Sequence, residues 1–544
     1  MEVETGTSER SSFVREAFQE LCVLDPKSLA SGGGSSRLFN KFKDVGTVRQ
    51  VGPTRILTPI RNLELPRRGG VEAWHLYTLF DCALDFGYPT VVIDYVTQVC
   101  QDAFAVSSDP TQSFLMDQAL VEVWCEEVSL YLRREFISLL ETVDPSDHTF
   151  LSKGAWIEKL LCNLELIFEV LLLPQKEGGS IAAPQAPQAA NIALSDCARQ
   201  VSDVIRSCKT CNWSCHEGLS QLPQSGRHGS VSEWKSSLDR CKKRFGNSKL
   251  FIQDLLSGVN LPIGSYPFTS FIDAVKKIYL QPKTSAGPRQ QKRVYLYYLI
   301  DIGCPDSIIN SYAAHFDLAN AECAAIRAYS QLDSQDSACI DEACSLLPSI
   351  TKQIDHARVV EFLMLLGKPQ AALDIIRSTQ SEHVFPAKNE ALLTLDIYLS
   401  CKGLYEAFLY CQKLWKRAED SRCIDTSKEC TRRLCTWSEK HNLTNKLMEM
   451  PFTAKDEVYL HECFDELSMT SAKNTPHWPL YLVLRRRYVE ASAALKDIQA
   501  KLDQQNKQMR DDSVHVYRQL SDLIDTALGS LPKVQREMSS TSQI

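Results

Sequence analysis

The chain has 544 residues, which is enough for a large hydrophobic core and for more than one compact unit. Hydrophobic residues make up 44% of it, and glycine and proline contribute only 23 residues each, which excludes a mainly disordered or collagen-like chain. The formal net charge of −7 gives no bulk attraction to phosphates, so we expect no direct binding of nucleic acid.

Twenty cysteines are too few for a disulfide scaffold in a chain of this length, and no N-terminal signal peptide is recognisable. We therefore expect reduced thiols and an intracellular protein. The most apolar run, residues 164–173, contains two glutamates and stops at Pro174. Because a helix needs about 20 apolar residues to cross a bilayer, no membrane insertion is predicted.

The predicted elements begin after residues 1–70, whose serine, glycine and basic residues indicate a mostly disordered arm. Residues 71–173 form a first helical block, in which apolar side chains recur with steps of three and four rather than alternating by two. The clearest stripe consists of Ile157, Leu160, Leu161, Leu164, Ile167, Phe168, Leu171 and Leu172.

A composition rich in proline, glycine, alanine and glutamine over residues 174–195 predicts a flexible linker. Residues 196–535 then continue the helical pattern, and the serine- and threonine-rich residues 536–544 predict a disordered tail. Nowhere do two alternating runs flank a hairpin turn, so the predicted fold class is all-α.

A turn of similar composition recurs between the predicted helices. Each copy begins with glycine, which tolerates the left-handed conformation that ends a helix, and three copies have proline two residues later, where the next helix can begin. The four pairs are Gly87 and Pro89, Gly303 and Pro305, Gly367 and Pro369, and Gly403 and Tyr405. Their irregular spacing favours an irregular α-solenoid of αα-hairpins, with chance recurrence of a generic turn as the alternative.

The sharpest metal-ligand pattern is Cys208, Cys211, Cys215 and His216, which offers the four soft ligands of a tetrahedral zinc site. The same thiols continue a helical apolar stripe that includes Val204, so packing in the core is the favoured interpretation and no cofactor is predicted. The chain also lacks a nucleophile elbow, a phosphate-binding loop and a His-Glu-x-x-His motif. No catalytic residue is therefore predicted.

Three short basic clusters stand out along the chain. They are residues 242–244, the group of Arg289, Lys292 and Arg293, and residues 485–487. The first two are typical of solvated faces or weak nuclear-import signals. The third lies at a predicted helix–helix turn and is a candidate for partner binding, with a solvated corner as the alternative. This candidate comprises Arg485, Arg486, Arg487 and Tyr488.

Several segments carry a resemblance to a known family. Residues 74–83, 96–100, 106–110 and 114–117 resemble the plant RING-type ubiquitin ligase family called "high expression of osmotically responsive genes". Further segments resemble the helical domain that this family shares with the nucleoporin ELYS, so an ELYS-like α-solenoid is expected. These segments are residues 342–348, 367–373, 448–451, 459–463 and 487–491.

The resemblance departs from the family at the RING finger, which needs eight cysteine and histidine ligands for two zinc ions. Between Cys22 and Cys82 this chain has no cysteine, and His75 is its only histidine. The zinc ligands therefore have no positions here to which they can be carried over. Either the region was lost or skipped by splicing, or this family member does not itself recruit a ubiquitin-conjugating enzyme.

The resemblance implies a helical scaffold of the nucleus, nuclear envelope and nuclear pore, with the cytoplasm as a further compartment, linked to messenger RNA export and gene regulation. Its expected partners are nuclear-pore scaffold subunits or regulatory proteins, together with ubiquitin machinery. The alternative function is that of an E3 ubiquitin ligase, or a ligase subunit, whose RING another isoform or partner supplies. Direct RNA binding is disfavoured by the acidic balance.

Overall fold

A computed structural model provides the fold of the protein. It describes the following residues: 80–97 except 82, 86, 88 and 95, then 118–172, 188–221, 230–244, 249–281, 287–334, 336–379, 388–401, 403–417, 421–470, 475–504 and 511–532. The arm predicted over residues 1–70 and the tail predicted over 536–544 lie outside them. All regular elements within these ranges are helical and none is a strand, which confirms the all-α prediction.

The chain divides into two compact units, residues 1–335 and 336–544. In the first unit the elements are α7 (Pro89–Asp94), α8 (Gln118–Thr142), α9 (His148–Leu171), α10 (Gln188–His216), η3 (Leu219–Gln221), α11 (Val231–Arg244), α12 (Phe251–Gly258), η5 (Ile263–Ser265), α13 (Phe271–Val275), the π-helical η6 (Lys276–Leu280), α14 (Pro288–Asp301), α15 (Asp306–His315) and α16 (Asn320–Leu332).

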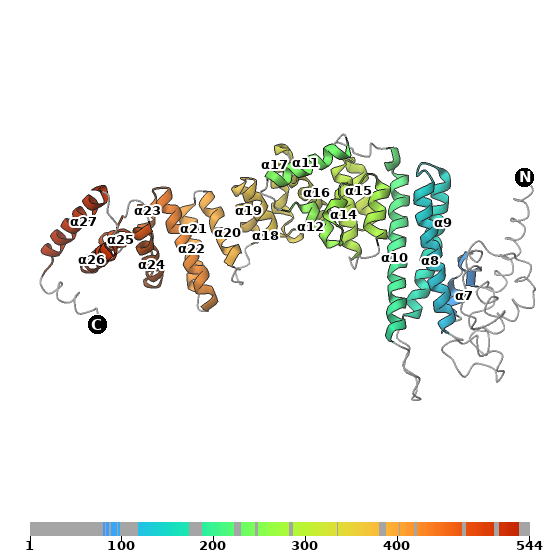
Figure 1. The fold of residues 1–544 in the computed structure, drawn as a ribbon, viewed down its shortest axis with the longest axis horizontal. Helices are drawn as coiled ribbons and strands as arrows, with labels where there is room; N and C mark the ends of the chain where they lie inside the picture. The colour runs from blue at the N-terminus through green and yellow to red at the C-terminus, as the bar shows by residue number, and fades with distance from the viewer. Residues whose placement is uncertain are drawn as a thin grey trace, which may run out of the picture. The chain divides into compact units, whose positions relative to one another are not determined.

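Three long helices, α8, α9 and α10, lie side by side in the first unit (Figure 1). The apolar stripe predicted on α9 is buried against its neighbours, except for Leu172, which caps the helix end and is half-exposed. The predicted linker over residues 174–195 is too long, because α10 already begins at Gln188. Alanines at positions 189, 190 and 193 favour helix there.

The second unit contains α17 (Ser337–Leu346), η7 (Leu347–Ser349), η8 (Thr351–Gln353), α18 (His356–Leu365), α19 (Pro369–Thr379), α20 (Lys388–Ser400), α21 (Leu404–Arg417), α22 (Ser421–Lys440), α23 (Thr444–Met448), α24 (Ala454–Thr470), α25 (His477–Leu484), α26 (Tyr488–Gln504) and α27 (Asp511–Ser530). From α18 onward each helix packs mainly on its neighbours along the chain (Figure 1). This sequential packing of short antiparallel helices is the arrangement of an irregular α-solenoid.

Three of the four predicted glycine turns have the expected backbone. Gly87, Gly303 and Gly367 all adopt positive φ angles, of 82°, 80° and 70°. At the second turn Cys304 donates its N–H to the Leu299 carbonyl at 3.0 Å, which satisfies a carbonyl that the end of α14 leaves free. The following helices begin at or just after the prolines: Pro89 and Pro369 are the first residues of α7 and α19, and Pro305 precedes α15.

Gly403 behaves differently from the prediction, since it is not among the described residues with positive φ. Its N–H donates to the Tyr398 carbonyl at 3.0 Å, five residues earlier, so Gly403 makes the hydrogen bond that Cys304, the residue after the glycine, makes in the second turn. Tyr405 is then an exposed residue in the first turn of α21 rather than the counterpart of a helix-starting proline. The composition match had the wrong register here because no proline fixes it.

The same turn geometry also occurs where a residue other than glycine takes the left-handed position. Asn260, Asp317, Asn442 and Arg486 have φ angles of 54°, 54°, 55° and 62°, and after each of them the next N–H returns to a carbonyl five residues earlier. Asparagine and aspartate tolerate this conformation better than most residues, whereas arginine does not. A search for Gly-x-Pro therefore found only part of the set of αα-hairpin turns.

Candidate partner-binding surface

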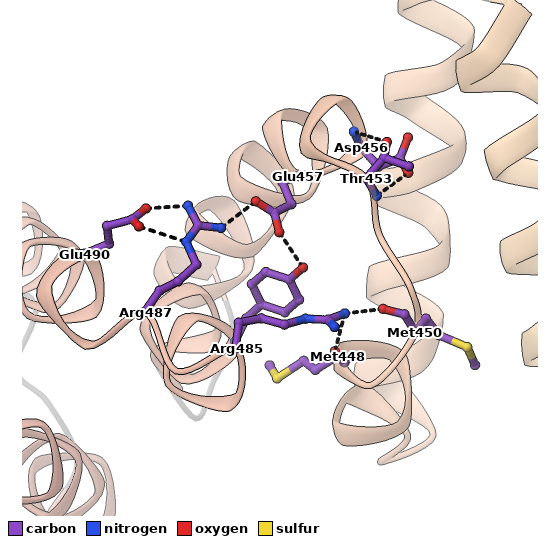
Figure 2. Close-up of polar contacts among 9 residues, drawn as sticks. Met448, Met450, Thr453, Asp456, Glu457, Arg485, Arg487 and Glu490 are labelled. Atoms are coloured by element: carbon purple, nitrogen blue, oxygen red, sulfur yellow. Dashed lines mark hydrogen bonds and ion pairs between the residues drawn. The ribbon is translucent and has the colours of Figure 1, made fainter. Parts of the chain in front are cut away.

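The candidate partner-binding residues lie at the turn between α25 and α26 of the second unit. Figure 2 shows two of them, Arg485 and Arg487. Arg485 caps the C-terminus of α25, Arg486 takes the left-handed conformation, and α26 begins at Tyr488. The chain thus reverses direction within three residues, so consecutive arginines face different surroundings. We call residues 485–488 the arginine corner.

Arg485 is used inside the protein. One of its terminal nitrogens donates to the Met448 carbonyl at 3.4 Å and to the Met450 carbonyl, at the end of α23 (Figure 2). Its guanidinium also lies over the Tyr481 ring, 5.2 Å from the ring centroid. A charged donor on a helix-terminal carbonyl satisfies an acceptor that the helix leaves free, so Arg485 fixes α25 against the loop after α23.

Arg487 is also bound inside the protein, but its partners are carboxylates. Its Nη1 lies 2.6 Å from Glu457 Oε2 on α24, and its Nε lies 2.9 Å from Glu490 Oε1 on α26 (Figure 2). Hydrogen bonds to Glu490 and Glu457 raise the pKa of the Arg487 guanidinium above its usual range. The Tyr481 hydroxyl donates to Glu457 at 2.9 Å, so this carboxylate links α24, α25 and α26.

The position of Glu457 depends on the start of α24. Thr453 Oγ1 accepts from the Asp456 N–H at 3.4 Å, and an Asp456 carboxylate oxygen accepts from the Thr453 N–H at 2.8 Å. This reciprocal capping box fixes the first turn of α24, which contains Glu457.

Arg486 and Tyr488 are the members of the corner that stay available to a partner. Arg486 is exposed, and its guanidinium forms no ion pair with any described residue. Tyr488 is partly exposed. An arginine in the left-handed region costs roughly 1–2 kcal/mol relative to a relaxed backbone, a cost that glycine would remove. Strained backbone conformations of this kind cluster at functional sites.

The basic cluster at Arg289, Lys292 and Arg293 is also used internally. Arg289 and Arg293 both bind the buried carboxylate of Glu322 on α16, Arg289 with Nη2 at 2.9 Å. Burial alone would raise the pKa of Glu322, but these hydrogen bonds hold it below its usual range. Lys292 donates to the Phe316 carbonyl at 2.8 Å. This cluster joins α14 to the end of α15 and to α16.

The thiols of the possible zinc site lie on α10 and face the interior. Cys208 and Cys211 are fully buried, whereas Cys215 is partly exposed and His216 is exposed at the end of the helix. Cys211 donates a hydrogen bond to Cys215, which raises the pKa of the Cys211 thiol, and burial raises the pKa of Cys208. Among the described residues, no group of three or more His, Cys, Asp or Glu side chains is placed to hold a metal ion.

A buried polar cluster that no sequence pattern indicated lies in the first unit. Asp333, after α16, accepts the N–H groups of Phe251 and Ile252 at 3.0 and 2.9 Å and the Tyr297 hydroxyl at 2.9 Å. Burial raises the pKa of this carboxyl to about 7. Two acids 32 positions apart form no local pattern, so only the fold could place Asp333 near a second buried carboxylate, Asp301.

Asp301, at the end of α14, is satisfied by aromatic donors. Its Oδ2 accepts from Trp234 Nε1 at 3.0 Å and from the Tyr266 hydroxyl at 2.5 Å. We call Asp301 and Asp333 the buried acid pair. Since their partners come from α11, α12, α14 and the segment after η5, the pair holds together elements that are distant in sequence.

The packed αα-hairpins define an all-helical protein with the architecture of an irregular α-solenoid. A comparison with protein families supports this class: residues 249–466 match the ELYS family model, described as "Nuclear pore complex assembly". The matched segment begins just before α12 and ends in α24, so it includes most of the buried acid pair's partners and Glu457, the ion-pair partner of Arg487.

A relative among characterised proteins is the E3 ubiquitin-protein ligase HOS1 of Arabidopsis thaliana. It is 25% identical over 560 aligned residues, which cover 87% of this chain and 59% of the relative. The resemblance predicted from the sequence is therefore confirmed on both counts, the ELYS helical domain and the ligase. The chain spans less than two thirds of the length of that relative.

Within the helices that the structure describes, none is long and apolar enough to cross a bilayer.

Proposed function

We propose that the protein is a helical scaffold that docks on nuclear-pore subunits or regulatory proteins, and that it serves messenger RNA export and gene regulation from the nucleus and nuclear envelope. The observation that carries this proposal is the ELYS match over residues 249–466. Stacked αα-hairpins suit the role because each adds side chains to a continuous lateral surface and none of them needs a catalytic group.

The arginine corner is the surface that we assign to this docking. Arg485 and Arg487 hold its backbone in place, and Arg486 then extends from a rigid support with Tyr488 beside it. Arginine and tyrosine contribute strongly to protein interfaces, because they combine a broad contact area with directional hydrogen bonds. A partner with an exposed carboxylate would complement this pair.

Proximity labelling in cells tests the proposal. The full chain fused to a biotin ligase is expected to label outer-scaffold subunits of the pore more strongly than the same ligase fused to a nuclear-import signal. Arg486→Glu combined with Tyr488→Ala is expected to reduce this enrichment. Lys446→Glu, another exposed basic residue of the second unit, is a matched control that should leave it unchanged. Uniform labelling of nuclear or cytoplasmic proteins would contradict the proposal.

A second candidate function is that of a ubiquitin ligase or ligase subunit, and it is favoured by the similarity to HOS1. Because residues 23–81 contain no cysteine and one histidine, we expect the purified chain to bind no stoichiometric zinc and to support no autoubiquitination with a panel of conjugating enzymes. A RING ligase in a parallel reaction is the positive control. Two zinc ions per chain, or autoubiquitin chains, would establish the ligase instead.

A further inference from the structure

A groove lies between α11 and α12 in the first unit, beside the buried acid pair. Its volume is about 330 Å³, within the range that binds ligands or inserted side chains. The side formed by α12 and η5 is mostly apolar, and the side formed by α11 carries charged residues. The lining residues are Lys235, Leu238, Asp239, Lys242, Leu250, Ile252, Gln253, Leu256, Ile263, Gly264 and Tyr266.

The spacing of residues on α11 explains how one face of this helix packs against the interior while an adjacent face lines the groove. Trp234 donates to Asp301, and Cys241 donates its thiol hydrogen to the Asp333 carbonyl at 3.2 Å, so one face of α11 is held against the interior. Lys235, Leu238 and Lys242 follow with steps of three and four, which places them on one adjacent face. This second face forms a wall of the groove.

The opposite side of the groove is apolar and firmly supported. Ile252 and Leu256 on α12 are almost fully buried at its floor. Tyr266 is held by its hydrogen bond to Asp301 and by edge-to-face contact with Trp234, with ring centroids 5.2 Å apart. Ile263, by contrast, is 43% exposed at the groove's edge. A large exposed aliphatic side chain next to a preformed apolar floor offers burial to an incoming side chain.

The rim of the groove carries a net positive charge. Lys235 is exposed and Lys242 is partly exposed, and neither forms an ion pair with a described residue. Asp239 is the one acid in the lining, and Arg240 and Lys243 add positive charge on the outer side of the same helix. An acidic partner would therefore be attracted to the rim and oriented by it.

We propose that this groove binds a short peptide segment of a partner protein, in which large apolar side chains are flanked by aspartates and glutamates. The volume has room for one or two such side chains, and the lysines would pair with the flanking acids. A single-stranded nucleic acid would need exposed rings for stacking, but Tyr266, the aromatic residue of the lining, is buried. This proposal rests on the proposed scaffold function, since it names the chemistry of one of its partners.

The test uses the full-length chain and a fluorescein-labelled peptide of sequence Asp-Glu-Leu-Phe-Asp-Ile-Glu-Glu, with fluorescence anisotropy as the readout. Saturable binding is expected, and it should weaken as salt screens the lysine–carboxylate pairs. A peptide with Asn and Gln in place of the acids should bind at least about tenfold more weakly, and so should one with Ala in place of the apolar residues, which corresponds to about 1.4 kcal/mol.

Matched variants locate the site. Lys235→Glu with Lys242→Glu should weaken binding at least about tenfold, whereas Arg240→Glu with Lys243→Glu reverses the same charge on the same helix outside the groove and should change it less than about twofold. Ile263→Glu should weaken binding several-fold, and Ile192→Glu, at another exposed isoleucine, should not. Circular dichroism of each variant checks that the fold is intact.

Several results would overturn the proposal. Among them are equal effects of the two charge-reversal pairs, undiminished binding in Ile263→Glu, and equal binding of the uncharged peptide. Saturable binding of a uridine oligonucleotide, or of phosphatidylserine-containing vesicles, in place of the peptide would also overturn it. Any of these leaves the cellular labelling of pore subunits unaffected, so failure of the groove and failure of the scaffold function can be distinguished.

Discussion

The buried acid pair of the first unit and the arginine corner of the second hold charged groups in opposite ways. Asp301 and Asp333 are enclosed, and neutral donors from the backbone and aromatic rings satisfy them. Arg485 and Arg487 are half-buried, and they donate to carbonyls and carboxylates near solvent. Enclosure makes each lost hydrogen bond expensive, whereas water can replace part of what the corner loses. The comparison therefore predicts a ranking of effects.

The largest effect is expected from Asp333→Ala. It leaves two buried backbone N–H groups and one buried hydroxyl without acceptors, at a cost of roughly 3 kcal/mol or more in the free energy of unfolding. Hydrogen-exchange mass spectrometry of the full chain should show faster exchange over residues 249–334. Tyr297→Phe removes one of the three donors and should have a clearly smaller effect. Similar exchange in both variants would mean that the acid is not the organising group.

The pH dependence of the first unit sharpens the comparison. Burial raises the pKa of Asp333 to about 7, against about 3.9 in an unfolded chain, so the folded form binds this proton more tightly. Its contribution to stability is complete below about pH 4 and is lost progressively as pH rises to about 7. Hydrogen exchange over residues 249–334 during denaturation, measured at several pH values, should show this fall in stability. Asp333→Asn, which cannot titrate, should remove it, and an unchanged slope would refute the assignment.

A smaller loss is expected at the corner. Arg487→Ala removes the link from α26 to Glu457 and should lower the free energy of unfolding of the second unit by about 1–2 kcal/mol. Arg487→Lys keeps the charge but loses the bidentate hydrogen bonding to Glu490, so it should retain only part of that stability. Exchange over residues 454–504 is the measurement. A loss as large as that of Asp333→Ala would remove the distinction between the two regions.

The smallest expected effect is a gain. Arg486→Gly places the residue best suited to the left-handed conformation at φ 62°, and should stabilise the second unit by up to about 1 kcal/mol. Asn442→Gly is a matched control that should gain less, since asparagine already tolerates this conformation. If Arg486→Gly stabilises the chain and at the same time weakens pore labelling, the arginine is retained for partner binding. Destabilisation would instead give Arg486 a structural role.

The spacing of apolar residues predicted the buried face of a helix well where the helix packs along most of its length. The α9 stripe was buried as expected up to Leu171, because a helix of 24 residues packed along two neighbours leaves little choice of orientation. Near the C-terminus the same spacing was less informative. Leu520 and Ile524 of α27 are buried, but Leu523 is 51% exposed, since α27 packs mainly on α26 and its contact face is narrow.

The candidate site was predicted by position but not by role. Three consecutive arginines lie at a helix–helix turn, as the sequence predicted. The sequence did not indicate which of them would remain without an internal partner. Arg485 and Arg487 met acceptors from residues 448–450 and Glu457, about 30 to 40 positions away, and only Arg486 stayed available. The groove likewise needs α11 and η5 together, and sequence spacing does not show that contact.

The sequence by itself determined that the chain is helical, which face of α9 is buried, that glycine ends three helices, and that the chain resembles a nuclear-pore helical domain beside a ligase. These properties depend on interactions within about one helical turn, or on similarity that runs along the chain. The tertiary structure alone decided which charges are enclosed, which are paired and which remain exposed. Those outcomes depend on groups that are far apart in sequence and meet only when the helices pack.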